Sequence, residues 1–583
     1  MNTNEQPVKQ LPLGISDFEL INKQNCYYVD KTMFIPRMEF VSNYLFLVRP
    51  RRFGKSLMLS MLKAYYDVNM KDSFDKLFGD LWIGSHPTPY KNYYAVLHLD
   101  FSQVIGSIGK LQENFDEYCG MVCEIFAQQY EHLFYDGFAK DVKEASNAGG
   151  KLNLIGRKAK MYGVPLYLIV DEYDNFTNTV LNQHGEDIYM SLTHGEGFYR
   201  DIFKIFKPNF ERVLMLGVSP VTMDDLTSGY NIATNITAEG EFNQMLGFSE
   251  DDVRVMFNYY KDAGWLKNDV ETMIEEMKPW YDNYCFARAV VDSDPKMFNP
   301  DMVLYYLNYV MRCGRSPEQM IDPNMRTDYN KMMKLIQIDS LSNSRRGVIH
   351  QIADDGYIYA TPVESFPAKE LADEKNFVSL LLYYGMLTIG GTFGTLTKLI
   401  IPNNNVRKQY YEFLLNEYQS IARVDISGLE MDFTLAAIKG EWRAMLQTIA
   451  DSYSKATSVR QLAEGERSLQ GFMNAYLSLS SYWLLAPEME LSHGYCDFFL
   501  MPDLRRYPMV AHSYILELKY LPVSATPAQA EQQWLQAEEQ IRRYAAAARV
   551  KALSAGTTLH LLILQIRGYN LERFDEVNPE AAL

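Results

Sequence analysis

Runs of apolar residues alternate with helically spaced segments through the first part of the chain. Residues 44–48 are apolar and lead into a short loop, after which apolar side chains recur at near-helical spacing from Leu57 to Tyr65. Further largely apolar runs occupy 94–101, 166–170 and 212–218. A continuous apolar run is typical of a strand buried on both faces of a parallel sheet. The pattern predicts an α/β fold assembled from βα units.

The loop after the first strand contains Gly54, Lys55 and Ser56 in succession. A phosphate-binding loop needs a glycine so that backbone N–H groups can close on phosphate oxygens. It also needs a lysine for the outer phosphates and a hydroxyl for magnesium. The full pattern G-x-x-x-x-G-K-[ST] would place its first glycine at Arg49, so only the second half is present. Taken alone, the loop can equally be a turn that caps a helix.

Polar residues follow two of the later strands. Asp171 and Glu172 end the run at 166–170, and Ser219 ends the run at 212–218. Ligands of open α/β sheets bind outside the carboxyl ends of the strands, so these residues are expected beside the phosphate loop. Asp171 would hold magnesium and Glu172 would polarise the attacking water, with Ser219 touching the γ-phosphate or that water. The alternative is a solvated strand end, but the order of the strands favours an ATPase.

Composition and charge narrow the class of protein. The chain has 583 residues, of which 47% are hydrophobic, enough for several packed domains. Its N-terminus is polar and no apolar run approaches ~18 residues, so we expect a cytoplasmic protein without a membrane segment. A formal charge of −17 argues against binding nucleic acid through the overall field, although a local basic groove stays open. The six cysteines are scattered, which favours reduced buried thiols over zinc.

A second set of polar residues lies near the C-terminus. The side-chain period of a strand is two, so Glu517 and Lys519 share one face of the strand at 514–520. Asp497, on a neighbouring strand, would complete a magnesium site made of oxygen ligands, and Lys519 would position or deprotonate water. The alternative is a solvated face, because alternating Glu and Lys are common on exposed strands.

Several motifs in the first half of the chain together resemble the bacterial AAA-ATPase-like family. They are LPLGISDF at 11–18, YVDKT at 28–32, RPRRFGKSL at 49–57, VDEYD at 170–174, GVSP at 217–220, LGFS at 246–249, WYDNY at 280–284 and FNP at 298–300. In that family the first loop glycine is commonly replaced by this Arg-Pro-Arg-Arg form, whereas Asn283 stands where glycine is usual.

The resemblance implies an AAA-type P-loop NTPase domain over 1–240 and a helical lid over 241–298. It also implies that ATP and Mg²⁺ are the cofactors. The nucleotide-binding residues would be Arg52, Phe53, Gly54, Lys55, Ser56, Leu57, Asp171 and Ser219, with Ser56 and Asp171 as metal ligands. AAA-type ATPases often borrow an arginine from a neighbour, for which Arg200 and Arg212 are candidates. A homo-oligomer is therefore one alternative that the sequence leaves open.

Residues 299–430 are expected to be a helical connector. Apolar runs at 386–389 and 396–401 flank Gly390, Gly391 and Gly394, which is typical of a β-hairpin. This hairpin suggests a winged-helix-like module, and a purely structural connector is the alternative.

The C-terminal motifs GYCDFFL at 494–500 and ILELK at 515–519 resemble the PD-(D/E)XK nuclease superfamily. The resemblance covers 464–569 and implies a restriction-endonuclease-like α/β domain over 431–583. Asp497 and Glu517 would hold Mg²⁺ and act with Lys519 in hydrolysis. Gln540 and Tyr544 match a helical Gln-x-x-x-Tyr pattern on 533–550, and Glu466 matches a glutamate of the first helix.

Together these patterns predict a hydrolase that joins an ATPase to a nuclease. DNA as the substrate comes from the resemblance, and RNA stays open. Two other readings are an ATP-controlled switch whose nuclease fold only binds nucleic acid, and a nuclease with a degenerate nucleotide site.

Overall fold

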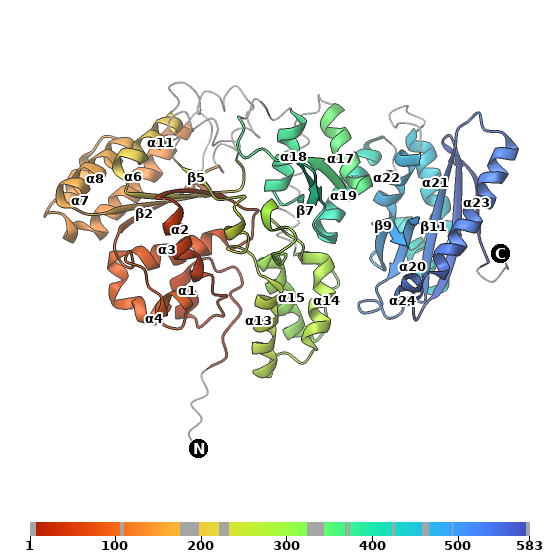
Figure 1. Cartoon of the computed structure of the whole chain (residues 1–583), viewed down its shortest axis with the longest axis horizontal. Coiled ribbons are helices and arrows are strands. Elements are labelled where there is room, and N and C mark those ends of the chain that lie inside the picture. The colour runs from red at the N-terminus through yellow and green to blue at the C-terminus, as the bar shows by residue number, and fades with distance from the viewer. Residues whose placement is uncertain are drawn as a thin grey trace, which may run out of the picture. The chain divides into compact units, whose positions relative to one another are not determined.

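A computed structural model describes most of the chain (Figure 1). The described residues are 7–104, 110–174, 198–220, 233–322, 343–367, 370, 373–421, 426–457, 466–491 and 494–578. The chain divides into two compact units. The first comprises 1–348 and 357–405, and the second comprises 349–356 and 406–583.

The first unit is built on a five-stranded sheet with the order β2-β3-β4-β1-β5. Every paired neighbour in this sheet is parallel. The strands are β1 (Tyr44–Val48), β2 (Ala95–Asp100), β3 (Leu166–Asp171), β4 (Arg212–Gly217) and β5 (Thr234–Asn235). Every residue of β3 and β4 is buried, which explains their continuous apolar sequences and confirms the predicted α/β class.

Helices cover both faces of this sheet. Figure 1 shows α6 (Leu111–Gln129), α8 (Ala148–Tyr162) and α11 (Phe198–Asn209) on one side. The other side carries α1 (Phe18–Lys23), α3 (Lys55–Tyr66) and α4 (Phe74–Phe78). Because α3 follows β1 directly, its N-terminus lies at the carboxyl edge of the sheet.

Three helices follow the sheet, and the first two lie within the 241–298 range of the predicted lid. They are α13 (Glu250–Asp262), α14 (Val270–Tyr281) and α15 (Pro300–Cys313). A capping box between Ser249 and Asp252 begins α13. Asn283, just after α14, has a φ of 84°. Asparagine tolerates this left-handed region better than most residues, so it can replace the glycine that the family pattern has here.

A small sheet ends the first unit. Its strands β6 (Tyr357–Ala360), β7 (Thr388–Phe393) and β8 (Leu396–Ile400) are antiparallel in the order β6-β8-β7. Helix α18 (Glu374–Tyr383) lies between β6 and β7 in the sequence, and α17 (Asn343–Asp355) precedes them. The β7–β8 pairing confirms the predicted hairpin and fits a winged-helix-like module. Gly394, at φ 58°, provides the left-handed turn.

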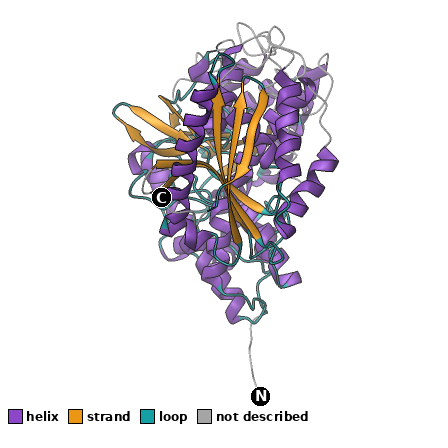
Figure 2. Ribbon diagram, turned by 90° about the vertical axis from the view of Figure 1, so that its right-hand side faces the viewer, coloured by secondary structure: helices purple, strands orange, loops and turns teal. Residues whose placement is uncertain are grey.

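The second unit contains a mixed five-stranded sheet with the order β13-β12-β11-β10-β9, whose strands are orange in Figure 2. The strands are β9 (Trp483–Leu491), β10 (Gly494–Pro502), β11 (His512–Leu521), β12 (Thr558–Arg567) and β13 (Asn570–Glu576). Only β11 and β12 are parallel among its pairs. Its helices are α19 (Asn404–Ile421, largely in this unit), α20 (Ile426–Lys439), α21 (Arg443–Thr457), α22 (Glu466–Leu477), α23 (Pro527–Ala546) and α24 (Ala548–Leu553).

Helix α23 connects β11 to β12 and packs on both strands. It begins earlier than the predicted 533–550 because Thr526 and Gln529 form a capping box and Pro527 occupies the first turn. It ends at Ala546, and a separate short helix carries the chain from Ala548 to Leu553.

All six cysteines lie in the described ranges and none forms a disulfide there. Five of them are buried, as expected of structural thiols, and Cys313 is exposed. No helix within the described ranges is long and apolar enough to cross a membrane. The division of the chain into four parts at 240, 298 and 430 stays a prediction.

Candidate functional site

The loop between β1 and α3 has the backbone shape of a phosphate-binding loop. Gly54 is the N-cap residue of α3 and has a φ of 90°, in the region that glycine adopts without strain. Because glycine has no side chain to cap the helix, the first amide groups of α3 are left for an anion. The helix dipole favours negative charge at the same point. The predicted phosphate site is thus formed by the backbone itself.

Two side chains of α3 point to the reacting end of this site. The Lys55 ammonium donates hydrogen bonds to the carbonyl oxygens of Arg49 and Pro50, each at 3.1 Å. Ser56 Oγ donates to Asp171 Oδ2 at 2.7 Å. Burial raises the pKa of the Asp171 carboxyl to about 6. The structure therefore brings together the hydroxyl and the carboxylate that the sequence predicts as magnesium ligands.

Arg49 occupies the position of the missing glycine and is fully buried. Its guanidinium donates to the carbonyl oxygens of Val48 and Thr237 at 2.9 and 2.8 Å, and to that of Phe242 at 3.0 Å. It also stacks on the Phe286 ring at 4.4 Å. Burial lowers the pKa of Arg49 to about 9. Arg49 thus ties the base of the loop to the chain that follows β5.

We expect Arg49→Met to lower the free energy of unfolding of the first unit by about 2–4 kcal/mol. The methionine keeps apolar volume but leaves three buried carbonyl groups without their donor. Thermal and urea unfolding of the full chain would measure the change. Arg37→Met is the matched control, because Arg37 is exposed and donates only a long bond of 3.4 Å to the Glu241 carbonyl. Equal stability of the two variants would contradict this role for Arg49.

Three further polar residues lie at the carboxyl edge of the sheet. Glu172 has a φ of 50° and lines the pocket described next. Ser219 is fully buried, and its backbone N–H donates to Asp174 Oδ2 at 2.7 Å. Asp174 also accepts from the N–H of Val218 at 3.1 Å. Asp174 thus fixes the end of β4. Asp174 belongs to the VDEYD motif, but the motif alone did not indicate this role.

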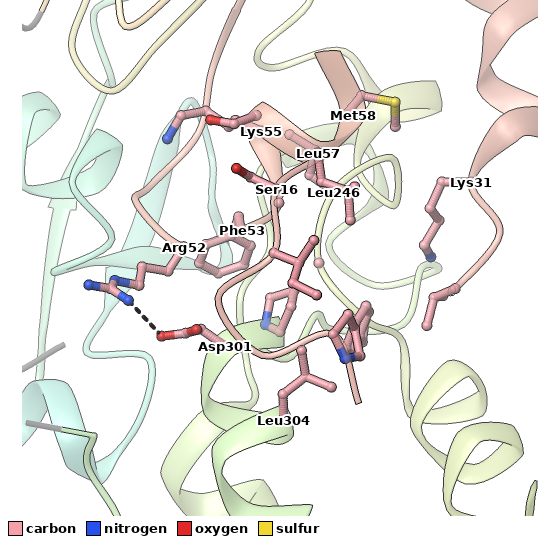
Figure 3. Close-up of a pocket in the computed structure, with 18 of the residues that line it drawn as sticks. Ser16, Lys31, Arg52, Phe53, Lys55, Leu57, Met58, Leu246, Asp301 and Leu304 are labelled. Atoms are coloured by element: carbon pink, nitrogen blue, oxygen red, sulfur yellow. Dashed lines mark hydrogen bonds and ion pairs between the residues drawn. The ribbon is translucent and has the colours of Figure 1, made fainter. Parts of the chain in front are cut away.

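A cavity of about 430 Å³ adjoins the loop (Figure 3). Six predicted nucleotide-binding residues line it: Arg52, Phe53, Gly54, Lys55, Ser56 and Leu57. Its apolar wall comes from four separate parts of the chain and includes Ile15, Tyr27, Tyr28, Val29, Met58, Met245, Leu246, Phe248, Met256, Pro300 and Leu304. An apolar wall beside a phosphate loop suits a nucleobase. Sequence reasoning missed this wall, because scattered apolar residues carry no motif.

Arg52 and Phe53 have local partners in addition to the cavity. Arg52 Nη1 forms an ion pair with Asp301 Oδ2 at 3.1 Å, drawn as a dashed line in Figure 3. The Phe53 ring packs edge-on against Tyr284 at 4.9 Å between ring centres. Both contacts join the loop to the chain between the end of α14 and the start of α15.

The two arginines proposed for a neighbour's site have different positions. Arg212 is 2% exposed at the first residue of β4, the end of the strand opposite to Asp171, and its Nη2 donates to Asn43 Oδ1 at 2.9 Å. A buried side chain at that end cannot reach another subunit's nucleotide, so this candidate is wrong. Arg200 lies on α11 and stays a prediction.

The C-terminal carboxylates and lysine also come together. Lys519 Nζ donates to Glu517 Oε1 at 2.7 Å, which confirms that the two side chains share a face of β11. Asp497 Oδ2, on β10, accepts from the backbone N–H of Leu518 at 2.7 Å. Glu517 is 1% exposed, and its Oε2 has no hydrogen-bond partner among the residues that the structure describes. A buried carboxylate oxygen without a donor is well suited to a cation.

This site offers a metal ion two carboxylate ligands and does not enclose it with protein ligands on all sides. Within the described part of the chain, no group of three or more His, Cys, Asp or Glu side chains is placed to hold a metal ion. Magnesium commonly takes one or two carboxylates and completes its shell with water and substrate phosphate. Asp497 and Glu517 fit that requirement.

The helical residues predicted for this site lie beside it. Gln540 Nε2 donates to the Tyr544 hydroxyl at 2.5 Å on α23. Burial is the main cause that raises the pKa of Tyr544, and the charges of Glu517 and Asp497 add to it. Glu466, the first residue of α22, contributes in the same way to the raised pKa of Lys519. Tyr544 and Glu466 are therefore close enough to interact electrostatically with groups of this site, and Gln540 is bonded to Tyr544.

Two regions of the chain match models of known families. Residues 12–227 match the AAA-ATPase-like family, described as "Predicted AAA-ATPase", and residues 464–576 match the PD-(D/E)XK nuclease superfamily. The chain contains both domains. The observed parallel sheet with its phosphate loop belongs to the AAA-ATPase-like domain. The mixed sheet with its Glu-x-Lys strand belongs to the PD-(D/E)XK domain.

Individual relatives add little beyond this. An Azotobacter chroococcum mcd 1 protein, named "Uncharacterized protein in vnfD 5'region", is 26% identical over 310 residues. That match covers 51% of this chain and 52% of the relative, so it spans about half of the relative's length. Among solved structures, the Aeropyrum pernix ORC2 protein in its ADPNP–ADP complexes matches with 9% sequence identity. The match covers 71% of this chain and 97% of the ORC2 chain. Its TM-score of 0.29 is too low to support an argument.

The PD-(D/E)XK carboxylates predict a pH dependence of metal binding. Burial, with the nearby charge of Asp497, raises the pKa of Glu517 to about 7. The folded, metal-free domain therefore binds a proton that the unfolded chain releases near its ordinary pKa of 4.5. This contribution to stability is complete below that value and is lost as the pH rises through about 7.

Because a cation competes with that proton, Mg²⁺ or Mn²⁺ affinity should rise about tenfold between roughly pH 6 and 8. Isothermal titration calorimetry at both pH values would measure it. Glu517→Gln, which cannot ionise, should bind weakly with little change between the two. An affinity of the parent protein that does not vary over this range would contradict the assignment.

Proposed function

We propose that this protein is an ATP-hydrolysing AAA-type protein coupled to a magnesium-dependent nuclease that cleaves nucleic-acid phosphodiesters, with DNA as the favoured substrate. The observation that carries the proposal is the buried Glu517 carboxylate, with one oxygen paired to Lys519 and the other without a donor in the described ranges. The match to the nuclease superfamily and the assembled phosphate loop support the two halves of this function.

At the ATP site each part has a distinct task. The amides at the start of α3 and the Lys55 ammonium would bind the phosphates, while Ser56 and Asp171 would hold magnesium. Bound magnesium would neutralise charge on the phosphate oxygens. Glu172 would orient the attacking water and accept its proton, and Ser219 would position the γ-phosphate or that water. The apolar wall would exclude solvent from the base.

At the nuclease site Asp497 and Glu517 would hold magnesium, which would polarise the scissile phosphate. Lys519, held at 2.7 Å from Glu517, would orient the attacking water and stabilise negative charge. Gln540 and Tyr544 form a hydrogen-bonded pair that would position these groups or the phosphate. A nucleic acid is the partner that this function implies.

Cleavage assays on the purified full chain test this function. Double-stranded DNA, single-stranded DNA and RNA are each incubated with Mg²⁺ or Mn²⁺, with and without ATP. We expect metal-dependent cleavage of at least the DNA substrates. If ATP is hydrolysed but no nucleic acid is cut under any condition, the nuclease half of the proposal fails and a regulatory or binding role for that fold takes its place.

A further inference from the structure

The small antiparallel sheet of the first unit, labelled at β7 in Figure 1, has one exposed face. Its other face belongs to the core, because Ile358, Ile389 and Leu399 are buried. The outward face of such a sheet is usually polar. Here the outward face carries aromatic and aliphatic side chains, and an exposed apolar patch commonly marks an interaction site.

Three aromatic rings follow one another across this face. The centre of the Tyr359 ring lies 5.4 Å from that of Tyr357 on the same strand, and 5.4 Å from that of Phe393 on β7. Phe393 is 67% exposed and Tyr359 is 40% exposed. Leu396, which is also exposed, pairs with Phe393 in the hairpin. These four residues and Lys398 are called the aromatic face below.

The charge on the aromatic face is positive. Lys398 pairs with Tyr359 on one side and with Gly391 on the other, and its ammonium lies 4.4 Å from the centre of the Tyr357 ring. The three strands contain no aspartate or glutamate, although the chain has 73 acidic residues. The face therefore combines aromatic rings with positive charge, as sites for unpaired nucleic-acid strands do.

The tip of the β7–β8 hairpin is held in place by Arg288. Its guanidinium donates to the carbonyl oxygens of Gly394 and Thr395, each at 2.7 Å. These acceptors carry no net charge, so Arg288 adds a second positive charge at the tip. Gly391 keeps the strand open to a ligand, because the nearest atom to a Cβ built there would be Lys398 Cβ, at 4.0 Å. A strand glycine that packing does not require often marks a close approach by a ligand.

These features favour an unpaired strand over a duplex. Every base has a face that stacks on an aromatic ring, and an unpaired strand can present those faces to a protein. A duplex has a higher linear charge density and relies on charge for binding, which the formal charge of −17 on the chain opposes. Stacking on the rings supplies affinity that the overall charge of the protein does not.

We propose that the aromatic face binds single-stranded DNA, with successive bases stacked on its rings and with Lys398 and Arg288 attracting phosphate oxygens. The inference rests on the proposed function for its partner, because that function takes DNA as its substrate. It adds a second DNA contact, made in the first unit by residues other than those of the nuclease site.

Fluorescence anisotropy of a labelled DNA strand titrated with the full chain tests the inference. EDTA prevents cleavage, and the same strand annealed to its complement is the duplex probe. We expect the parent to prefer the single strand. Phe393→Ala and Tyr359→Ala should each weaken its binding about fivefold or more. Because both rings are exposed, these variants should keep the parent's melting temperature.

Two further substitutions separate stacking from general apolar contact. Phe393→Trp keeps an aromatic ring and should bind the strand within about twofold of the parent, whereas Phe393→Leu should lose as much affinity as Phe393→Ala. Phe40→Ala is the matched control, because Phe40 is 91% exposed on α2 (Ile35–Val41), outside the aromatic face. It should bind the strand as the parent does.

The outcomes distinguish this inference from the function on which it rests. If the parent cuts DNA but Phe393→Ala and Tyr359→Ala bind the single strand as tightly as the parent, the inference fails and the nuclease function stands. If the parent binds the strand through these rings but cuts no nucleic acid, the nuclease function fails and the inference stands.

Three other results would overturn the inference. The first is a parent protein that binds no single strand, and the second is a loss of affinity that Phe40→Ala shares. The third is a parent dimer, seen by analytical ultracentrifugation, that Phe393→Ala dissociates without a change in affinity for the strand. The aromatic face would then be a contact between two copies of the chain.

Discussion

Replacing Glu517 with glutamine is expected to lower the rate of metal-dependent phosphodiester cleavage by a factor on the order of 10³. The amide preserves the volume of a side chain that is 1% exposed but removes the negative charge that would hold the cation. It also breaks the charge pairing that holds Lys519 at 2.7 Å. Single-turnover cleavage of a labelled DNA duplex in saturating Mg²⁺ would measure the loss.

Glu572→Gln is the control for this substitution. Glu572 is partly exposed and pairs with Arg567 at 2.7 Å on the hairpin of β12 and β13. A glutamine there should leave the rate within about twofold of the parent, because exposed ion pairs contribute little. Parent-like cleavage by Glu517→Gln would place the nuclease activity elsewhere or in a contaminant.

Lys55→Ala is expected to weaken ATP binding by a factor on the order of 10² and to abolish measurable hydrolysis. The ammonium is buried within the loop and would exchange its two carbonyl partners for phosphate oxygens. Titration with a fluorescent ATP analogue would measure the affinity.

Lys63→Ala provides the comparison within the same helix. Lys63 lies in the last turn of α3, away from the amides that begin the helix, and should bind ATP as the parent does. Should Lys55→Ala retain the parent's affinity and turnover, the nucleotide site would be degenerate. The first unit would then be a scaffold for the nuclease.

The sequence predicted the sites best where polar residues follow a buried strand or share one of its faces. Asp171 follows a run of buried apolar residues, and Glu517 and Lys519 are two apart on one strand, so their positions followed from local geometry. The Ser56–Asp171 bond of 2.7 Å joins residues from separate strand–helix units, as the order of motifs indicated. The strand order β2-β3-β4-β1-β5 does not follow from these local patterns, because pairing partners are distant in the sequence.

Arginines were the least predictable residues. In sequence Arg49 is notable only because it stands where the loop pattern has a glycine, yet its guanidinium is buried against carbonyl groups of Thr237 and Phe242. For Arg212 the sequence suggested a role that the structure excludes. It was a candidate for an exposed role, but Asn43 and the Tyr90 ring, 5.2 Å from its guanidinium carbon, enclose it. Both outcomes depend on partners that only the folded chain brings near.

Tyr384 shows a third limit of sequence reasoning. A tyrosine after an apolar helix predicts a core residue, and it is indeed buried. Burial raises the pKa of its phenol, and Ser219, from a segment with no shared motif, is among the groups that act on that pKa. The need for glycine at position 385, which follows it, could not be predicted from the sequence either. It comes from the close approach of Pro50 and not from a hairpin or a helix end alone.

The central claim is that the nucleotide site governs the nuclease. Its most direct measurement is the rate of DNA cleavage by the parent protein and by Lys55→Ala, each with no nucleotide, with ATP and with a non-hydrolysable ATP analogue. We predict that ATP changes the parent's rate several-fold, in a direction the assay will establish, and that Lys55→Ala cuts at one rate in all three conditions. Cleavage by the parent that is the same with and without either nucleotide, and equal to that of Lys55→Ala, would contradict the claim.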